Sequence, residues 1–308
     1  MKILNKNTNN KIQFNFMNKN IFLINNIEIM EDICNSYALM FANKSSSIDY
    51  EIEVEQNDIL IDKTVTKLIK IPNYFDFQKD ICGGSKAILK ELISFCLTYD
   101  AFSSESITNL FGIINTIDLT ELKALELLQN NLEQKLNIKF KYELQDQIIN
   151  YIAEQTILVI DDEVENKSFL FSQNKLRIIY LEILKILIKV SDKNLHFLFL
   201  NPFLGLNYEE MYHHYKNLDS IDNYTIITEK FVSEEKIDYS LMKLYLGDSI
   251  IDLSEIYDNK TFFSNFSDLT DDEAFINELK LKVDNLIVNY NTKNLDLSYP
   301  VFQYLLNK

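Results

Sequence analysis

Glycine and proline are scarce in this chain of 308 residues, which has five glycines and three prolines. Their scarcity allows long uninterrupted helices and leaves little material for glycine-rich catalytic loops. Cysteine is also rare: Cys34, Cys82 and Cys96 form an odd set without a CxxC pair. This spacing argues against a disulfide framework or a zinc knuckle and favours free thiols in a reducing compartment.

Long apolar runs are absent as well. No stretch approaches the roughly 18 apolar residues of a membrane span. The opening Met1-Lys2-Ile3-Leu4 passes at once into polar, asparagine-rich sequence, unlike a signal peptide. These features predict a soluble, cytoplasmic protein.

Positive charge is in deficit, because 46 acidic residues outnumber 30 basic ones and give a formal net charge of −16. Such a balance argues against indiscriminate nucleic-acid binding. Any DNA site must therefore be a local basic surface on an acidic body.

What the chain does have is a folding composition, with 47% hydrophobic residues. Period-two and period-three-to-four patterns divide it into expected elements. In the first part we expect two short strands within residues 12–25, a helix at 27–42, and strands at 48–54 and 59–71. From about residue 85 the pattern turns helical, and residues 81–152 resemble a helical hairpin or arm.

Alternation of strands and helices resumes after this arm. We expect strands at 156–161, 195–200 and 224–228, separated by helices at 173–190 and 208–218. This order predicts an α/β fold with a mostly parallel sheet covered by helices. The last part is acidic and mixed, and Thr270-Asp271-Asp272-Glu273 predicts a capping box that opens a helix to about residue 289.

The expected organisation is therefore an α/β head interrupted by an insertion. Residues 1–80 form the first half of the head, 81–152 a helical leg, and 153–232 the second half of the head. Residues 233–308 form a C-terminal extension of mixed helical character.

The most catalytic-looking motif is the apolar run Ile157–Ile160 followed by Asp161-Asp162-Glu163. A strand that ends in such carboxylates is typical of a Walker B segment, which holds magnesium beside a nucleotide phosphate. That chemistry also needs a phosphate cradle with a lysine. Only Gly83-Gly84-Ser85-Lys86 comes near it, without the required order, so a nucleotide-binding-like sheet without nucleotide is the favoured interpretation.

Histidine chemistry has little support. His213 and His214 are neighbours on an expected helix and point about 100° apart, so they cannot share a metal there. His196 begins an apolar strand. We therefore expect no histidine-based metal or catalytic site.

Basic residues gather in three places. Lys63, Lys67 and Lys70 lie in a strand-rich stretch, Lys135, Lys139 and Lys141 form a second cluster, and Lys175 and Arg177 open the helix at 173–190. Lysines at these places suit sequence-independent, salt-sensitive phosphate contacts. An ordinary solvated surface explains any one of them equally simply.

The whole-chain order of elements resembles the Csn-two family, the accessory spacer-acquisition proteins of type II-A CRISPR systems. The resemblance covers about residues 12–232 and rests on the order of elements. It includes Thr156–Ile160, the run His196-Phe197-Leu198-Phe199-Leu200-Asn201-Pro202, and Thr225–Thr228. The tail after residue 233 resembles the extension of the family's longer members.

The resemblance implies a head similar to a P-loop ATPase without a working Walker site, and a helical leg. It implies a non-catalytic homotetrameric ring that threads linear double-stranded DNA. The same family acts in antiviral defense together with the spacer integrase and the effector nuclease. A closed ring would reconcile the charges, because lysines could line the hole while the outer wall stays acidic.

Calcium is implied by the resemblance, but the sequence departs from the family at the expected segment. Alternating acidic residues are expected there, whereas this chain has Asn137-Ile138-Lys139-Phe140-Lys141-Tyr142, and lysine cannot ligate calcium. We hypothesise that the ammonium groups replace the cation. The remaining candidate metal ligands are carboxylates: Glu143, Asp146, Asp161, Asp162 and Glu163.

Two other classes of function remain open. One is a nucleotide-dependent enzyme built on the Asp161-Asp162-Glu163 strand end. The other is a protein-interaction scaffold that does not contact DNA.

Overall fold

The computed structural model describes most of the head and the C-terminal part, and selected stretches between them. The described residues are 2–9, 11–14, 17–41, 49–53, 66–82, 87–100, 105, 108–109, 112–113, 151, 172–191, 194–232, 237–246, 249–266, 271–290 and 297–306. They fall into two compact units. The first comprises residues 1–74 and 192–308, and the second comprises residues 75–191.

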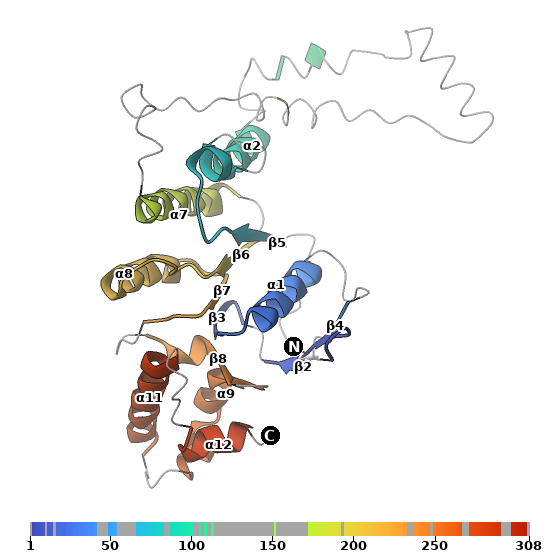
Figure 1. The fold of residues 1–308 in the computed structure, drawn as a ribbon. Helices are drawn as coiled ribbons and strands as arrows, with labels where there is room; N and C mark the ends of the chain where they lie inside the picture. Colours follow the sequence, from blue (N-terminus) through green and yellow to red (C-terminus); the bar gives the residue numbers. More distant parts are fainter. Residues whose placement is uncertain are drawn as a thin grey trace, which may run out of the picture. The chain divides into compact units, whose positions relative to one another are not determined.

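A six-stranded sheet forms the frame of the first unit, in the order β5-β6-β7-β3-β8-β9 (Figure 1). Its strands are β3 (Lys19–Leu23), β5 (Thr66–Ile71), β6 (Asn194–Leu200), β7 (Tyr224–Thr228), β8 (Met242–Leu246) and β9 (Ser249–Asp252). All neighbours are parallel except β8 and β9. The prediction of an α/β fold with a mostly parallel sheet is therefore confirmed.

Two helices cover opposite faces of this sheet (Figure 1). Helix α1 (Ile27–Phe41) follows β3, and α8 (Tyr208–Asp219) follows β6. The chain moves one way across the sheet after β3 and the other way after β6, so right-handed crossovers place their helices on opposite sides. The capping box between Asn207 and Glu210 starts α8 by satisfying free backbone donors.

A second, three-stranded antiparallel sheet packs against α1. It consists of β1 (Lys2–Asn5), β2 (Lys11–Gln13) and β4 (Tyr50–Glu53), in the order β2-β1-β4. One face of each strand contributes to a shared core with α1 and the large sheet, through residues such as Ile3, Ile12, Ile52, Ile33 and Phe22. Period-two alternation in the sequence places these side chains on that face.

The C-terminal part is joined to the head by its own strands. β8 pairs with β3 along Ile21–Leu23, and the antiparallel β9 extends the sheet to its edge. Helices α9 (Leu253–Asp258), α10 (Lys260–Ser264), α11 (Asp272–Asn289) and α12 (Pro300–Leu306) follow. The part expected as an extension thus completes the sheet of the first unit.

The second unit is built from helices. It contains a π-helical turn at Phe77–Cys82, α2 (Ile88–Asp100) and α7 (Gln173–Val190), and α2 packs against α7. Ser172 caps α7 by accepting a hydrogen bond from the Lys175 amide. The Gln173 side chain exchanges two 2.8 Å hydrogen bonds with the backbone of Phe75, which fixes the start of α7 beside the entry to this unit.

Most expected elements outside the leg occur close to their expected bounds, including the helix at 173–190 and the strand at 224–228. The capping prediction at residue 270 is wrong by one position. Asp271 is the N-cap of α11, and its carboxylate accepts from the Ala274 amide. The expected strand at 156–161 and most of the leg lie outside the described residues.

Unit boundaries fall at 74/75 and 191/192. Helix α7, which we placed in the second half of the head, groups with the helices of the second unit. The physical reason is its packing on α2.

Candidate functional site

Buried polar side chains form a row near the amino ends of four strands in the large sheet. Asn20 of β3, His196 of β6, Thr225 of β7 and Lys243 of β8 are each the second or third residue of their strand. All four are buried, with at most 4% of their surface exposed. Polar groups in such a place cost stability unless they have partners, so their contacts decide what the row can do.

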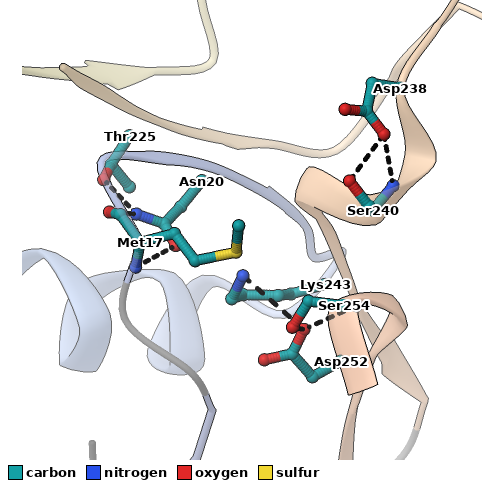
Figure 2. A network of polar contacts seen from close by, with 8 residues as sticks. All are labelled: Met17, Asn20, Thr225, Asp238, Ser240, Lys243, Asp252 and Ser254. Carbon is teal, nitrogen blue, oxygen red and sulfur yellow. Dashed lines mark hydrogen bonds and ion pairs between the residues drawn. The ribbon is translucent and has the colours of Figure 1, made fainter. Parts of the chain in front are cut away.

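Asn20 finds its partners in the chain that leads into β3. Its amide oxygen accepts from the Met17 amide at 3.2 Å, and its nitrogen donates to the Met17 carbonyl. The same nitrogen lies 3.5 Å from the Thr225 hydroxyl on the neighbouring strand (Figure 2). These bonds fix the approach to β3 and account for Asn20 as a structural residue.

His196 is held between the sheet and α1. Its Nε2 lies 3.0 Å from the Thr225 hydroxyl, and the rings of Tyr37 and Phe41 lie within 6.0 Å and 5.2 Å of its own. Burial lowers the pKa of His196 to about 4, because the charged ring would lose its hydration. The residue is therefore neutral near pH 7, and its contacts are those of a core histidine.

Lys243 is the most unusual member of the row, because it is fully buried. Its Nζ lies 3.7 Å from Oδ1 of Asp252 and 5.8 Å from the centre of the Phe22 ring (Figure 2). No hydrogen-bond partner lies within reach of this nitrogen among the described residues. Burial lowers the pKa of Lys243, and the carboxylate of Asp252 opposes that effect.

Asp252 also organises the chain after β9. Its Oδ1 accepts from the amide of Ser254 at 3.0 Å and from the hydroxyl of Ser254 at 2.6 Å, which caps α9. One carboxylate thus compensates the lysine and starts a helix. A buried lysine of lowered pKa can serve as a base or nucleophile, but here its nitrogen is closed off from any substrate, so the pair is structural.

The carboxyl ends of the strands are where α/β sheets usually bind ligands. The connection from β3 to α1 is Ile24-Asn25-Asn26, without glycine or lysine. The Asn26 side chain occupies the amides of Glu28 and Ile29, and Glu28 adds negative charge to the first turn. A phosphate would therefore find these donors taken and a carboxylate nearby.

The carboxyl end of β6 is also closed, by the side chain of Asn201, which directly follows the strand. Asn201 adopts a left-handed backbone with φ of 46°, and its amide oxygen accepts from the Glu229 amide after β7. Asparagine tolerates this conformation better than most residues. The contact ties two strand ends together.

Of the predicted DNA-binding residues in the first unit, Lys67 and Lys70 are described. Both are exposed on β5, the edge strand of the large sheet. Being three residues apart, they point to opposite faces, so the structure does not bring them together.

In the second unit, Lys175 and Arg177 also separate. Lys175 is exposed in the first turn of α7, whereas Arg177 is only 3% exposed. Two residues along a helix turn by about 200°, which carries Arg177 to the packed face. A buried guanidinium cannot meet a duplex phosphate, so Arg177 fits the predicted role poorly.

The exposed face of α7 carries the predicted Lys175 together with two lysines that were not predicted from the sequence, Lys185 and Lys189. Lys175, Lys185 and Lys189 follow one another at helical spacing, together with the exposed Ile178 and Ile186. Glu182 is the one acidic residue of α7, and it pairs with Lys185 at 2.8 Å. Spacing by three and four along the helix was the signal available for this face.

The other predicted site residues lie outside the described residues. They are Lys63, Lys135, Lys139 and Lys141 for DNA, and Glu143, Asp146, Asp161, Asp162 and Glu163 for metal. Within the residues that the structure describes, no group of histidine, cysteine, aspartate and glutamate could hold a metal ion. The helices of these described segments include none with the length and apolar character that a bilayer crossing requires.

Comparisons with known proteins identify a fold rather than a family. No protein-family model matches the sequence, and no curated protein does so. The α/β fold is similar to solved structures, one of which is Stu0660 of Streptococcus thermophilus. The two chains share 14% identity with a TM-score of 0.57, over 100% of this chain and 93% of the other.

Proposed function

We propose that this chain is a non-catalytic, double-stranded-DNA-binding protein of CRISPR spacer acquisition. The observation that carries the proposal is the fold shared over its whole length with Stu0660, a CRISPR-associated protein of the Csn-two family. At 14% identity this likeness establishes the fold, and the role is inferred from it.

The connection between β3 and α1 supports a role without nucleotide hydrolysis. Asn25 and Asn26 stand where a P-loop would offer glycines and a lysine, and Asn26 already uses the local amides. An ATPase assay of the parent chain and of the double variant Asp162→Ala/Glu163→Ala tests this. We expect neither protein to hydrolyse ATP. If the parent hydrolyses ATP and the double variant does not, the protein is an enzyme instead.

We assign the phosphate contacts to exposed lysines in two places. One is the α7 face with Lys175 and Lys189, beside the half-buried Lys185, and the other is the edge strand β5, whose Lys67 and Lys70 lie on opposite faces. Lysine binds phosphate as a point charge, which suits contacts that ignore base sequence.

Assembly into a homotetrameric ring would place such surfaces around linear duplex. With a net charge of −16 on each chain, side-on approach of DNA is unfavourable, while a lysine-lined hole concentrates the favourable contacts. In this proposal the ring acts in the cytoplasm with the spacer integrase and the effector nuclease. Native mass measurement is the direct test of four subunits.

A gel-shift comparison of linear and covalently closed duplex tests the DNA proposal. We expect binding to linear duplex only, with affinity that falls steeply as salt rises. The variant Lys175→Gln/Lys185→Gln/Lys189→Gln should weaken binding, and it should lower the salt slope by about one unit for each phosphate that a lysine no longer neutralises.

The matched control removes three lysines from the three-stranded sheet. Lys2, Lys6 and Lys11 are exposed there, on a different unit from α7. One lysine of each set pairs with a glutamate, Lys6 with Glu51 and Lys185 with Glu182, so the two sets match in charge and in ion pairing. Their change to Gln should leave binding unchanged. Equal binding to linear and covalently closed duplex would contradict threading. An equal loss of binding in both triple variants would contradict a specific contact of DNA with α7.

A further inference from the structure

A cluster of aromatic rings stands partly exposed on the C-terminal helices. Phe262 and Phe263 of α10, Phe266 just after it, and Tyr304 of α12 form this aromatic patch. The Tyr304 ring centre lies 5.8 Å from Phe262, 5.9 Å from Phe263 and 5.0 Å from Phe266. Two helices separated by more than thirty residues of chain thus bring four rings together.

Only part of the patch is used to hold the fold. Phe263 is 1% exposed, whereas Phe262 is 49% exposed and Tyr304 is 38% exposed. A single exposed ring is common in soluble proteins, but neighbouring exposed rings around a buried one form a contiguous apolar surface. Such surfaces, rich in large rigid rings, provide the anchor points of protein interfaces.

Carboxylates lie near α10, one through a hydrogen bond and two through their place in the chain. Asp258 precedes α10 and is exposed, as is Glu273 in the first turn of α11. Asp272 is fixed beside α10, because its Oδ2 accepts from the Thr261 hydroxyl at 3.1 Å. Lys260 is the basic residue of α10.

We infer that the aromatic patch docks a polypeptide segment of a partner protein, with aliphatic side chains flanked by lysine or arginine. The rings accept the aliphatic side chains, and the carboxylates near α10 complement the basic flanks. The same carboxylates repel phosphates, so neither nucleic acid nor an anionic membrane fits this surface. The inference does not depend on DNA binding and goes beyond it.

A fluorescence-anisotropy titration with the full chain tests this docking surface. The first probe is a short labelled peptide with a leucine–proline–leucine centre and lysines at both ends. The second probe carries glutamates in place of the lysines, and the third is a labelled thymidine oligonucleotide. We expect saturable binding of the lysine peptide, with the other two probes weaker by about tenfold or more.

Phe262→Ala/Tyr304→Ala should weaken binding of the lysine peptide by about tenfold or more, as loss of interface anchors does. Tyr304→Phe keeps the ring and should bind as the parent chain does. The matched control is Leu281→Ala/Val288→Ala, which removes exposed apolar side chains of α11 (64% and 66% exposed) and should change nothing.

A charge reversal makes the test independent of ring removal. Asp258→Lys/Glu273→Lys should weaken the lysine peptide and strengthen the glutamate peptide. The inference is overturned if both peptides bind the parent chain equally or not at all. It is also overturned if the oligonucleotide binds more tightly, or if the ring and charge variants bind like the parent chain. None of these results bears on the gel-shift test of DNA threading.

Discussion

Lys243 and Asp252 face each other across the antiparallel ladder of β8 and β9, with 3.7 Å between Nζ and Oδ1. Both side chains are shielded from water, at 0% and 7% exposure. The pair therefore closes the edge of the large sheet with an internal ion pair. Its two members differ in their other contacts, since Asp252 also accepts from Ser254 while the lysine depends on the carboxylate.

This asymmetry predicts unequal costs for removing the two partners. Asp252→Asn should lower the free energy of unfolding by about 3 kcal/mol, because it leaves a buried ammonium without its counter-charge. Lys243→Met should cost clearly less, since Ser254 still serves the carboxylate. Chemical denaturation of both variants measures the difference. If the Asp252→Asn chain is as stable as the parent, the ion pair makes no net contribution to the free energy of unfolding.

The buried lysine also predicts a pH dependence. Burial lowers the pKa of Lys243 in the folded chain below its ordinary 10.5. Between that lowered pKa and 10.5, the unfolded chain therefore binds more protons than the folded chain. The contribution of Lys243 to stability therefore improves as pH rises through that window. Denaturation at increasing alkaline pH should show the parent gaining relative to Lys243→Met. Parallel pH curves for the two chains would be inconsistent with a lowered pKa.

His196 predicts an effect in acid. Its pKa is lowered from 6.5 to about 4, so below pH 6.5 the unfolded chain takes up a proton that the folded chain refuses. The folded state should lose about 2 to 3 kcal/mol from this residue by about pH 4.5. His196→Gln, which can keep a bond to Thr225, should lose less over the same range.

The exposed His213 supplies the control for that measurement. His213→Gln should follow the acid curve of the parent chain. Identical acid curves for His196→Gln and the parent would refute the assignment of acid sensitivity to the buried ring.

Tyr290, directly after α11, predicts how firmly the C-terminal part holds the sheet. Its hydroxyl lies 2.9 Å from the Leu23 carbonyl of β3 and 2.6 Å from the Tyr245 carbonyl of β8. Tyr290→Phe should cost about 1 kcal/mol or more, because it leaves buried carbonyl oxygens with one donor fewer. Tyr304→Phe, on a partly exposed ring, should cost nothing measurable in the same thermal melts. If Tyr304→Phe costs more stability than Tyr290→Phe, the hydroxyl of Tyr290 does not hold the C-terminal part to the sheet.

The response of the assembly to calcium tests the hypothesis that Lys139 and Lys141 replace a bound cation. If the two ammonium groups replace a cation, calcium should leave the assembly mass and its melting temperature unchanged. Lys139→Glu/Lys141→Glu supplies oxygen ligands and should make the assembly calcium-dependent. Native mass spectra with and without calcium decide this. Strong calcium dependence of the parent chain would refute the replacement hypothesis and direct attention to Glu143, Asp146 and Asp161.

Strongly periodic segments were predictable from the sequence because their pattern reports one buried face. The spacing in Gln173–Val190 defined α7 to the residue, and the apolar run Tyr224–Thr228 defined β7. The alternation of such segments also predicted the parallel sheet, since parallel strands need helical crossovers. The strands β8 and β9 escaped prediction, because Lys243 and Asp252 interrupt their apolar pattern with charges.

The candidate site was less predictable for the same reason. A lysine in a sequence is expected in solvent, and Lys243 is internal only because Asp252 reaches it across the hairpin. Lys67 and Lys70 are close in sequence, but the pleat of β5 turns them apart. Lys175, Lys185 and Lys189 are spread along α7, but its turn aligns them.

The sequence by itself determined where most helices and strands form, because hydrophobic period and capping residues are local properties. Only the tertiary structure decided that the C-terminal strands complete the head, that Lys243 and Arg177 are internal, and that Phe262 meets Tyr304. These outcomes depend on contacts between residues far apart in the chain. Local patterns carry no record of which distant partner will compensate a buried charge or leave a ring exposed.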